Sequence, residues 1–484
     1  MSTNPKVDKI AIAAHLALLP SPGPSGSSLS TPQPVTIEAS ITTGLITAVI
    51  KEFRPESAYD LTSYQYVSIP SGCLLFPGLI DAHVHLNEPG RTAWEGFATG
   101  TDAAASGGVT TLIDMPLNSI PPTTTVENLN KKLEAAINQC RVDVGFWGGV
   151  IPGNENDLLP LVEAGMRGFK CFLIDSGVEE FPCVTADDLL KAMPKLQEVE
   201  SLLLFHAELD CPASLHARSN NDHPTNANHF NLYSTFLDSR PSQFETEAIS
   251  LVVDLTKKFP KLKTHIVHLS AAEALPIIVS ARSSGLKLIL RTQTCLHYLT
   301  LSDVAIPDGR AEFKCCPPIR TLTNQDKLWQ GLLADEIDYI VSDHSPCTID
   351  LKENRTLMEA WGGIGGLGLG ISLIWTEGQR RKIENLPGWI LKWFCERPAK
   401  QVKIDHLKGK IEVGAECDLC IFDPNSSFEV TTNEVHFKNK ISPYLGMQMD
   451  GRVIRTVLRT QTVFDLEKSG FGGIETERKG RLLL

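Results

Sequence analysis

The sequence contains no apolar run that approaches the roughly 20 residues needed to cross a bilayer as a helix. Its opening, MSTNPKVDKI, lacks the apolar core of a signal peptide, and its ending, RLLL, is not the peroxisomal S-K-L signal. The chain also lacks a basic excess, because 45 Lys and Arg face 57 Asp and Glu. We therefore expect a cytoplasmic protein that binds neither nucleic acid nor a membrane.

The cysteine pattern lacks the paired CxxC motifs of a structural zinc site. Cys417 and Cys420 form a lone CxxC within the apolar run CDLCIF, with no second pair nearby. A core strand is the favoured interpretation of that run. Twelve cysteines without a signal peptide indicate free thiols in a reducing compartment.

Short apolar runs alternate with helical patterns through the middle of the 484-residue chain. The expected strands are one that ends at His85 and those at 109–115, 142–148, 168–174, 201–207, 263–270, 286–292 and 338–343. Helical patterns fall between them at 126–141, 185–200 and 245–259. Such alternation predicts parallel strands with crossover helices, and eight units predict a closed (β/α)8 barrel of the TIM type.

The two ends of the chain look different from its middle. Short β patterns occupy about 7–72, interrupted by the Pro/Gly/Ser-rich segment SPGPSGSSLSTPQP, and β patterns return after about residue 400. We expect both ends to form one small β-sandwich beside the barrel. The predicted division is 1–75 and 401–484 for the small domain, including a C-terminal tail, and 76–400 for the barrel.

The most informative motif is the pair His83 and His85 in FPGLIDAHVHLNEPG. Residues i and i+2 of a strand project to the same face, so both imidazoles could reach one cation. Asp343, in SDHSPC, follows at close to the roughly 250 residues that separate the first and eighth strands of a barrel. Closure of the barrel would bring these strand ends together.

Three further residues, Lys170, His206 and His268, fall at or near the C-terminal ends of predicted strands, where barrel enzymes carry their chemistry. With the HxH pair and Asp343 they are too many ligands for one catalytic zinc. They suit two metals about 3.5–4 Å apart that share a bridging hydroxide.

Lys170 fits such a site only after chemical change. A protonated amine repels cations, whereas the carbamate formed with CO₂ is a bidentate anion that can bridge two metals. The alternative is a buried lysine paired with a carboxylate, and the surrounding ligands favour the carbamate.

Other histidines are weaker candidates. His265 precedes His268 by three residues, so on a strand the two face opposite sides, and His268 lies nearer the strand end. His216, His223 and His229 fall in a polar loop and are not expected to bind metal. Gly363, Gly365 and Gly368 match G-x-G-x-x-G without a preceding strand, so a glycine-rich wall near the substrate is favoured over a dinucleotide site.

Several ordered motifs from about residue 70 to 460 resemble the cyclic amidohydrolases of the amidohydrolase superfamily. They are PGLIDAHVHLNEPGRTAWEGFATGT, DMPLNSIPP, GFKCFLIDSG, the SRP that contains Arg240, HIVHLS, HYL, CCPPIR, VSDHSPC, WGGIGG and SPYLGM. The resemblance implies a binuclear metal centre with a carboxylated lysine, held here by His83, His85, Lys170, His206, His268 and Asp343. Zinc is the expected metal, although Mn, Fe and Co suit the same ligands. The resemblance also implies a homo-oligomer, a tetramer.

Within this family the resemblance is greatest to enzymes that open allantoin to allantoate. Relatives that open dihydroorotate have Arg two residues after the second His, whereas this chain has Asn87, which suits a neutral ureido-substituted hydantoin better than an anion. Asn118, in MPLN, fits the same substrate. Cys316 stands where relatives commonly have Ser, and QTCLHY replaces their ETCPHY, which leaves the role of Gln293 open.

The expected reaction is hydrolysis of the cyclic amide by the bridging hydroxide, with Asp343 as proton shuttle. Simple ligation by Asp343 without proton transfer is compatible with the same geometry. A hydantoinase or dihydropyrimidinase of wider specificity is the alternative enzyme. A non-catalytic dihydropyrimidinase-like scaffold is a third possibility, and the presence of all six ligands argues against it.

Overall fold

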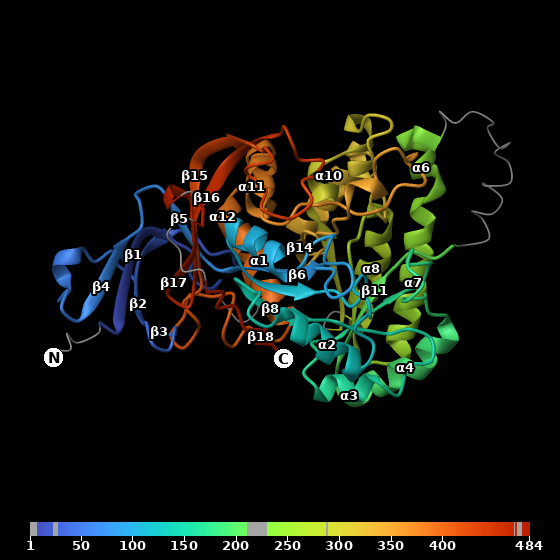
Figure 1. Ribbon diagram of the computed structural model, residues 1–484, viewed down its shortest axis with the longest axis horizontal. Helices are drawn as coiled ribbons and strands as arrows, with labels where there is room; N and C mark the ends of the chain where they lie inside the picture. The colour runs from blue at the N-terminus through green and yellow to red at the C-terminus, as the bar shows by residue number, and fades with distance from the viewer. Residues whose placement is uncertain (1–6, 23–27, 211–229, 287–288, 469, 472–476) are drawn as a thin grey trace.

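Parallel strands arranged as a barrel occupy the centre of the computed structural model, which describes residues 7–22, 28–210, 230–286, 289–468, 470–471 and 477–484 (Figure 1). The strands are β6 (Leu79–Val84), β7 (Val109–Asp114), β8 (Asp143–Phe146) with β9 (Gly148–Gly149), β10 (Phe169–Phe172), β11 (Leu202–His206), β12 (Lys263–Ile266), β13 (Leu290–Cys295) and β14 (Tyr339–Val341). Because β8 and β9 are separated only by Trp147, they count as one position, and all eight predicted strands are present.

Two hydrogen-bonded sheets make up the barrel wall. One runs β14-β13-β12-β11-β10-β9 and the other contains β8-β7-β6, with every neighbouring barrel pair parallel. A parallel bridge between Val84 and His344, with a 2.8 Å hydrogen bond from His85 N to His344 O, joins the first strand to the segment after the eighth. The residues that follow β6 and β14 therefore lie side by side, as predicted.

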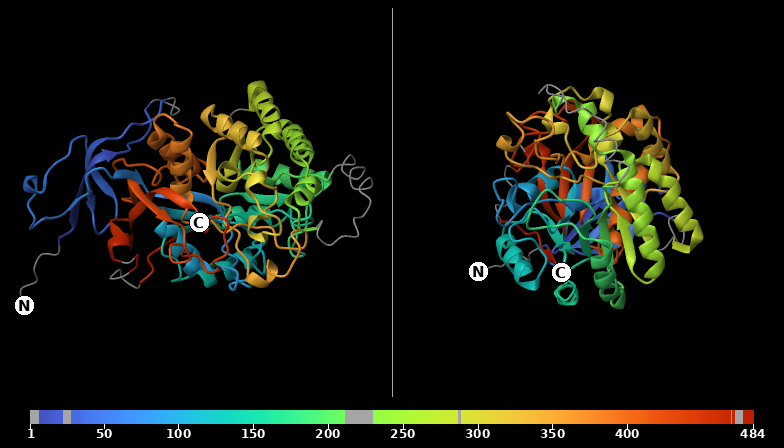
Figure 2. Two further views of the ribbon diagram at one scale, coloured as in Figure 1. Left: turned by 90° about the horizontal axis from the view of Figure 1, so that it is seen from above. Right: turned by 90° about the vertical axis from the view of Figure 1, so that its right-hand side faces the viewer.

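Helices cover the outside of the barrel, and the two further views show them around the strands (Figure 2). The three predicted segments are α2 (Val126–Ala136), α4 (Ala186–Glu198) and α7 (Ser242–Lys258). Thr125 and Thr185 cap the first two by accepting from backbone N–H groups. The other α-helices of the described residues are α1 (Phe97–Ser106), α3 (Leu158–Glu163), α6 (Tyr233–Ser239), α8 (Leu275–Ala281), α9 (Leu296–Thr300), α10 (Leu322–Leu333), α11 (Gly370–Arg380), α12 (Leu386–Leu391) and α13 (Arg397–Gln401).

Two predicted strands have different limits in the structure. The segment predicted as a strand at 286–292 starts as helix, because a helical turn over Arg282–Leu286 continues α8, and β13 begins only at Leu290. The strand predicted at 263–270 ends at Ile266. His268 therefore lies on the loop beyond β12, with a left-handed φ of 38°.

Strands from both ends of the chain form a second sheet, at the left of Figure 1, as predicted. Its order is β17-β16-β15-β5-β1-β2-β3, and β4 pairs with β1. These strands are β1 (Lys9–Ala17), β2 (Gln33–Ser40), β3 (Ile46–Ile50), β4 (Tyr64–Ser68), β5 (Leu74–Pro77), β15 (Leu419–Glu429), β16 (Gln448–Leu458) and β17 (Gln461–Asp465). The sheet has its own apolar cluster, which includes Ile12, Cys417 and Leu419. Cys420 is also fully buried, so the CDLCIF segment is a core strand.

The C-terminal tail adds a contact that the sequence did not predict. β18 (Leu482–Leu483) pairs in parallel with β8 and extends that part of the barrel wall. The domain limits at 75/76 and 400/401 remain a prediction. In the structure a single residue, Gly78, joins β5 of the small sheet to β6 of the barrel. Among the described helices, none is both long and apolar enough to cross a membrane.

Candidate active site

The six predicted ligands share one place in the fold. All of them line a single cavity of about 1230 Å³ at the C-terminal ends of the barrel strands: His83, His85, Lys170, His206, His268 and Asp343. Lys170 lies within β10, and His206 is the last residue of β11. His85 immediately follows β6, and Asp343 lies two residues beyond the end of β14.

The donor atoms of this group approach one another closely. Asp343 Oδ1 lies 3.1 Å from His83 Nε2 and 3.5 Å from His85 Nε2. One donor atom from each of His83, His268 and Asp343 falls within 4.8 Å of the others. The rings of His206 and His268 are 4.6 Å apart between centroids. Four imidazoles and a carboxylate thus converge on one end of the cavity.

The backbone also distinguishes this end of the barrel. His268 and Asp343 adopt left-handed φ values of 38° and 47°, which are uncommon outside glycine, although His, Asn and Asp adopt them more often than other residues do. Conformations of this kind concentrate at functional sites, where the surrounding structure enforces them. The two ligands from loops are therefore held in place by the fold.

Three of the imidazoles have the protonation state that metal binding requires. Burial lowers the pKa of His83 and His268 well below the ordinary value, and it also lowers the pKa of His206. These rings are neutral at physiological pH and offer a lone pair each. Burial alone would raise the pKa of Asp343, but His83 and His85 outweigh it and hold the pKa below its ordinary value. The donor set fits divalent cations that accept nitrogen and oxygen ligands.

Lys170 has unusual surroundings for a lysine. Its side chain is buried, and burial lowers the pKa of the amine from 10.5 to about 7. No carboxylate lies within ion-pair distance of its Nζ among the described residues, and the ring centroid of Phe172 is 5.1 Å from that atom. The alternative of a lysine paired with a carboxylate therefore has no partner in the described part of the chain. A neutral amine is the form that reacts with CO₂.

Two of the imidazoles have amide partners at their Nδ1 atoms. Gln293 Nε2 lies 2.7 Å from His83 Nδ1, and Asn118 Nδ2 lies 3.3 Å from His85 Nδ1. The contact of Gln293 was not predicted, because the residue is 210 positions from His83 in sequence. Both contacts leave the Nε2 atoms of the HxH pair facing Asp343.

His206 has a carboxylate partner instead. Its Nε2 lies 2.7 Å from Glu208 Oε2, and the same oxygen accepts a 2.5 Å hydrogen bond from Arg240. Burial would raise the pKa of Glu208, but Arg240 and His206 outweigh it and hold the pKa at about 2. The sequence offered one hint of this arrangement, since Glu208 is two residues from His206, but nothing local indicated Arg240.

The histidines that were weaker candidates lie elsewhere. His265 is fully buried and does not line the cavity; its Nε2 contacts Gln293 Oε1 at 3.2 Å, and its ring stacks on Tyr339. The structure thus separates His265 from His268, as predicted, although His268 lies on the loop beyond β12 and not on the strand. His216, His223 and His229 lie outside the described residues.

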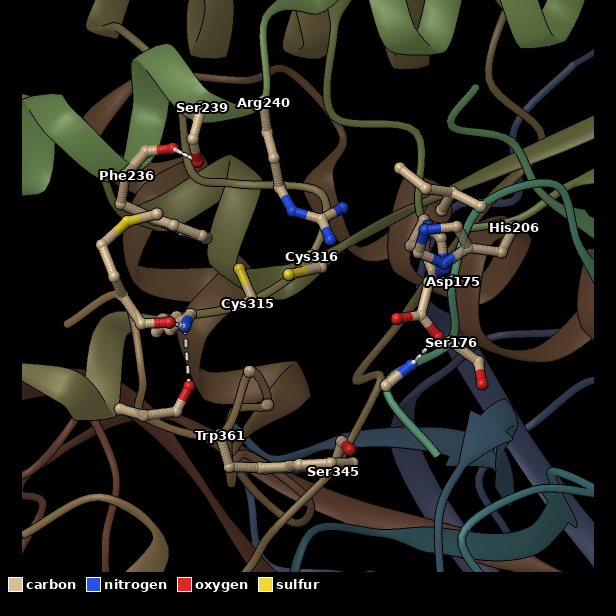
Figure 3. Close-up of a pocket in the computed structure, with 18 of the residues that line it drawn as sticks. Asp175, Ser176, His206, Phe236, Ser239, Arg240, Cys315, Cys316, Ser345 and Trp361 are labelled. Carbon is tan, nitrogen blue, oxygen red and sulfur yellow. Dashed lines mark hydrogen bonds between the residues drawn. The ribbon is translucent and has the colours of Figure 1, made fainter. Parts of the chain in front are cut away.

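The predicted substrate contacts fall in different surroundings. Asn118 and Cys316 line the cavity, whereas Asn87 is buried outside the lining and donates through Nδ2 to Pro346 O at 3.3 Å. Figure 3 shows Arg240 together with Cys315 and Cys316, and His206 with Asp175 across the pocket. Roles for Asn87, Asn118 and Cys316 in substrate binding remain predictions.

The glycine-rich segment forms part of the cavity wall. Gly362 and Gly363 line the cavity, and a Cβ at Gly363 would lie 2.2 Å from Ser345 O. Only glycine permits this close approach of two backbones. The segment leads to α11 at Gly370. Contact of this wall with substrate remains a prediction.

Comparison with known proteins agrees with this geometry. The amidohydrolase family matches residues 74–470. Allantoinase of Saccharomyces cerevisiae is 44% identical over 458 residues, which cover 93% of this chain and 95% of the yeast protein. Allantoinase of Escherichia coli is 35% identical over 88% of this chain and 91% of its own.

Solved structures share the fold. The L-hydantoinase (dihydropyrimidinase) from Arthrobacter aurescens superimposes with a TM-score of 0.84, at 24% identity, over 98% of this chain and 99% of its own. The match extends over barrel and small sheet together. Since the family match spans most of the sequence and the relatives are covered almost end to end, the chain belongs to the amidohydrolase family, within its allantoinase branch.

Proposed function

We propose that this protein opens the hydantoin ring of allantoin by hydrolysis of a ring amide, with allantoate as product. The observation that carries the proposal is the convergence of six side chains of metal-binding type on one cavity. The names of its relatives, which are allantoinases, support the choice of substrate.

The same six residues would hold two divalent cations, with zinc as the expected metal and a carboxylated Lys170 as the shared anion. Asp343 lies against His83 and His85, and the rings of His206 and His268 lie against each other. Bound there, such ions would lower the pKa of water toward about 7 and polarise the amide carbonyl.

Asp343 is the candidate for proton transfer. Its Oδ1 faces His83 and His85, which leaves Oδ2 to accept a proton from the attacking water and to deliver it to the ring nitrogen that leaves. The carboxylate remains ionised at neutral pH because the imidazoles keep its pKa low. It therefore starts the reaction in the form that accepts a proton.

The rest of the cavity would bind the substrate. Asn118, beside His85, can donate to a carbonyl and accept from an N–H, which suits a neutral ureide. Cys316 lines the wall beside the glycine-rich segment, since a Cβ at Gly362 would lie 3.2 Å from its Sγ. A homo-oligomer, with a tetramer as the expected form, completes the proposal.

An assay of allantoin opening, with and without chelator and with Zn, Mn or Co restored, tests this function. We expect activity that is lost on chelation and recovered with metal. Dihydrouracil and hydantoin should be opened more slowly than allantoin. Faster opening of dihydrouracil would favour a dihydropyrimidinase, and absence of bound metal would favour a scaffold.

A further inference from the structure

The carboxylate of Glu208 connects a wall of the cavity to one of the proposed metal ligands. Glu208 is fully buried. Its Oε2 lies 2.7 Å from the ring nitrogen Nε2 of His206 and accepts a 2.5 Å hydrogen bond from the guanidinium of Arg240. Its other oxygen, Oε1, has no hydrogen-bond partner among the described residues. All of its polar contacts are therefore made through one atom.

The ring of His206 is held on several sides. Phe172, its register partner on β10, stacks on it at 4.4 Å with an interplanar angle of 14°. His268 meets it edge-on at 4.6 Å. With Nε2 directed at Glu208, the nitrogen that remains for another partner is Nδ1.

A neutral imidazole carries its proton on one nitrogen and a lone pair on the other. A carboxylate oxygen at 2.7 Å only accepts, so the proton of His206 must be on Nε2. Nδ1 then has the lone pair that a cation needs. Partners of this kind orient a metal-binding histidine and increase its basicity.

We propose that Glu208 is a positioning residue, which fixes the tautomer and orientation of His206 so that Nδ1 is presented to the metal, and that Arg240 holds Glu208 in place. This inference rests on the metal centre of the proposed function. It assigns to Arg240 a role through Glu208, in addition to any contact that its cavity-lining side chain makes with substrate.

The position of the unpartnered oxygen allows a sharp test. In Glu208→Gln the amide oxygen can occupy the site of Oε2 and accept from both His206 and Arg240. The amide nitrogen then falls at the site of Oε1, where no hydrogen bond is lost. Glu208→Gln thus keeps the acceptor and removes the charge, whereas Glu208→Ala removes both.

The experiment is a titration of the chelated, metal-free protein with Co²⁺, followed by visible absorption and by metal content, with no substrate present. Glu208→Ala should bind the cation at His206 about 10–100-fold more weakly than the unaltered protein. Glu208→Gln should recover most of that loss. Unchanged affinity in Glu208→Ala, or an equal loss in Glu208→Gln, would overturn the inference.

Asp338→Asn is the matched control. Asp338 is also a buried carboxylate with arginine partners, Arg282 at 2.5 Å and Arg291 at 2.7 Å, but it precedes β14 at the opposite end of the strand from Asp343. Asp338→Asn should bind Co²⁺ with the affinity of the unaltered protein. If Asp338→Asn lost as much Co²⁺ affinity as Glu208→Ala, general destabilisation would explain both losses, and the inference would be overturned. Failure of the unaltered protein to bind Co²⁺ would instead refute the metal centre, and both inferences with it.

Discussion

Gln293 lies behind His83, with 2.7 Å between its side-chain nitrogen and Nδ1 of the ring. Its Oε1 is 3.2 Å from Nε2 of His265, whose Nδ1 is 3.1 Å from Gln401 Nε2. When His83 binds a cation through Nε2, the proton of the ring is on Nδ1. The amide group of Gln293 must then rotate by half a turn, so that its Oε1 accepts a hydrogen bond from Nδ1. A neutral amide can serve either state of the ring, whereas a carboxylate could only accept.

Replacing Gln293 should therefore affect metal binding. Gln293→Ala leaves Nδ1 of His83 without its partner and should weaken metal affinity about 10–100-fold. Gln293→Glu supplies a stronger acceptor and should retain metal. The same carboxylate, buried and unpaired in the metal-free protein, should lower the melting temperature of that form. Equal melting temperatures for metal-free Gln293→Glu and the unaltered protein would contradict this account.

Lys170→Ala should lose metal, because the shared anion cannot form. Short-chain carboxylic acids should restore part of the metal content and activity, since they supply a bidentate carboxylate in the space that the side chain leaves. Intact-mass analysis of the unaltered protein should show the mass of one added CO₂. Full metal occupancy in Lys170→Ala would contradict the proposed bridge.

Reconstitution of the metal-free protein should depend on pH through the same lysine. Burial lowers the pKa of Lys170 to about 7, so the amine is protonated below that value and neutral above it. One pH unit below the pKa only about a tenth of it can react with CO₂. At a fixed concentration of dissolved CO₂, the rate of metal uptake should rise as the pH increases through about 7. A rate that does not change across this range would exclude carbamate formation as the limiting step.

Asp343→Asn tests proton transfer separately from metal binding. The amide keeps an oxygen that can face His83 and His85, so metal should be retained. Loss of the group that moves the proton should reduce kcat by about 10²–10⁴-fold. Metal analysis of the same sample supplies the control, and near-normal turnover would leave Asp343 as a ligand only.

The stability of the fold in acid should depend on Asp338. Burial would raise the pKa of this carboxyl, but Arg282, Arg291 and Arg397 outweigh it and lower the pKa below its ordinary value. The unfolded chain therefore takes up a proton first as the pH falls. The contribution of Asp338 is complete above about pH 4 and is lost as the pH falls through the folded-state pKa.

Asp338→Asn should accordingly cost about 3–5 kcal/mol at neutral pH, the typical effect of breaking a buried ion pair. The cost should shrink in acid, where the unaltered protein loses the same charge. Urea unfolding at a series of pH values measures both. A cost that stays constant down to the lowest pH would show that the charge of Asp338 contributes nothing.

Much of the fold and all six candidate ligands could be predicted from sequence, because each depends on local pattern. The alternation of apolar runs located the strands, and the i, i+2 spacing placed His83 and His85 on one face. The predicted limits of β13 were wrong, because Leu286, the first residue of the predicted strand, ends the helical turn Arg282–Leu286, and the strand starts only at Leu290.

The partners behind the ligands could not be predicted, because no local pattern encodes them. Arg240 lies 32 residues from Glu208, and their contact depends on how α6 ends beside the cavity. The burial of Asn87 in the turn after β6, with its amide donating to Pro346 O, was not foreseen either, and its contact with substrate remains a prediction. Pairing of β18 with β8 joins segments more than 300 residues apart through two leucines, too short a run to register as a strand.

Gly78 alone separates the last strand of the small sheet's N-terminal part from the first strand of the barrel, and a Cβ there would lie 2.1 Å from Thr110 Oγ1. Strand side chains alternate with a period of two, so one residue gained or lost between this glycine and His83 would rotate both imidazoles out of the cavity. Natural variants should tolerate insertions and deletions before β5, but the number of residues between Gly78 and His83 should not change. The short connection from the small sheet would thereby determine which side chains of β6 face the cavity.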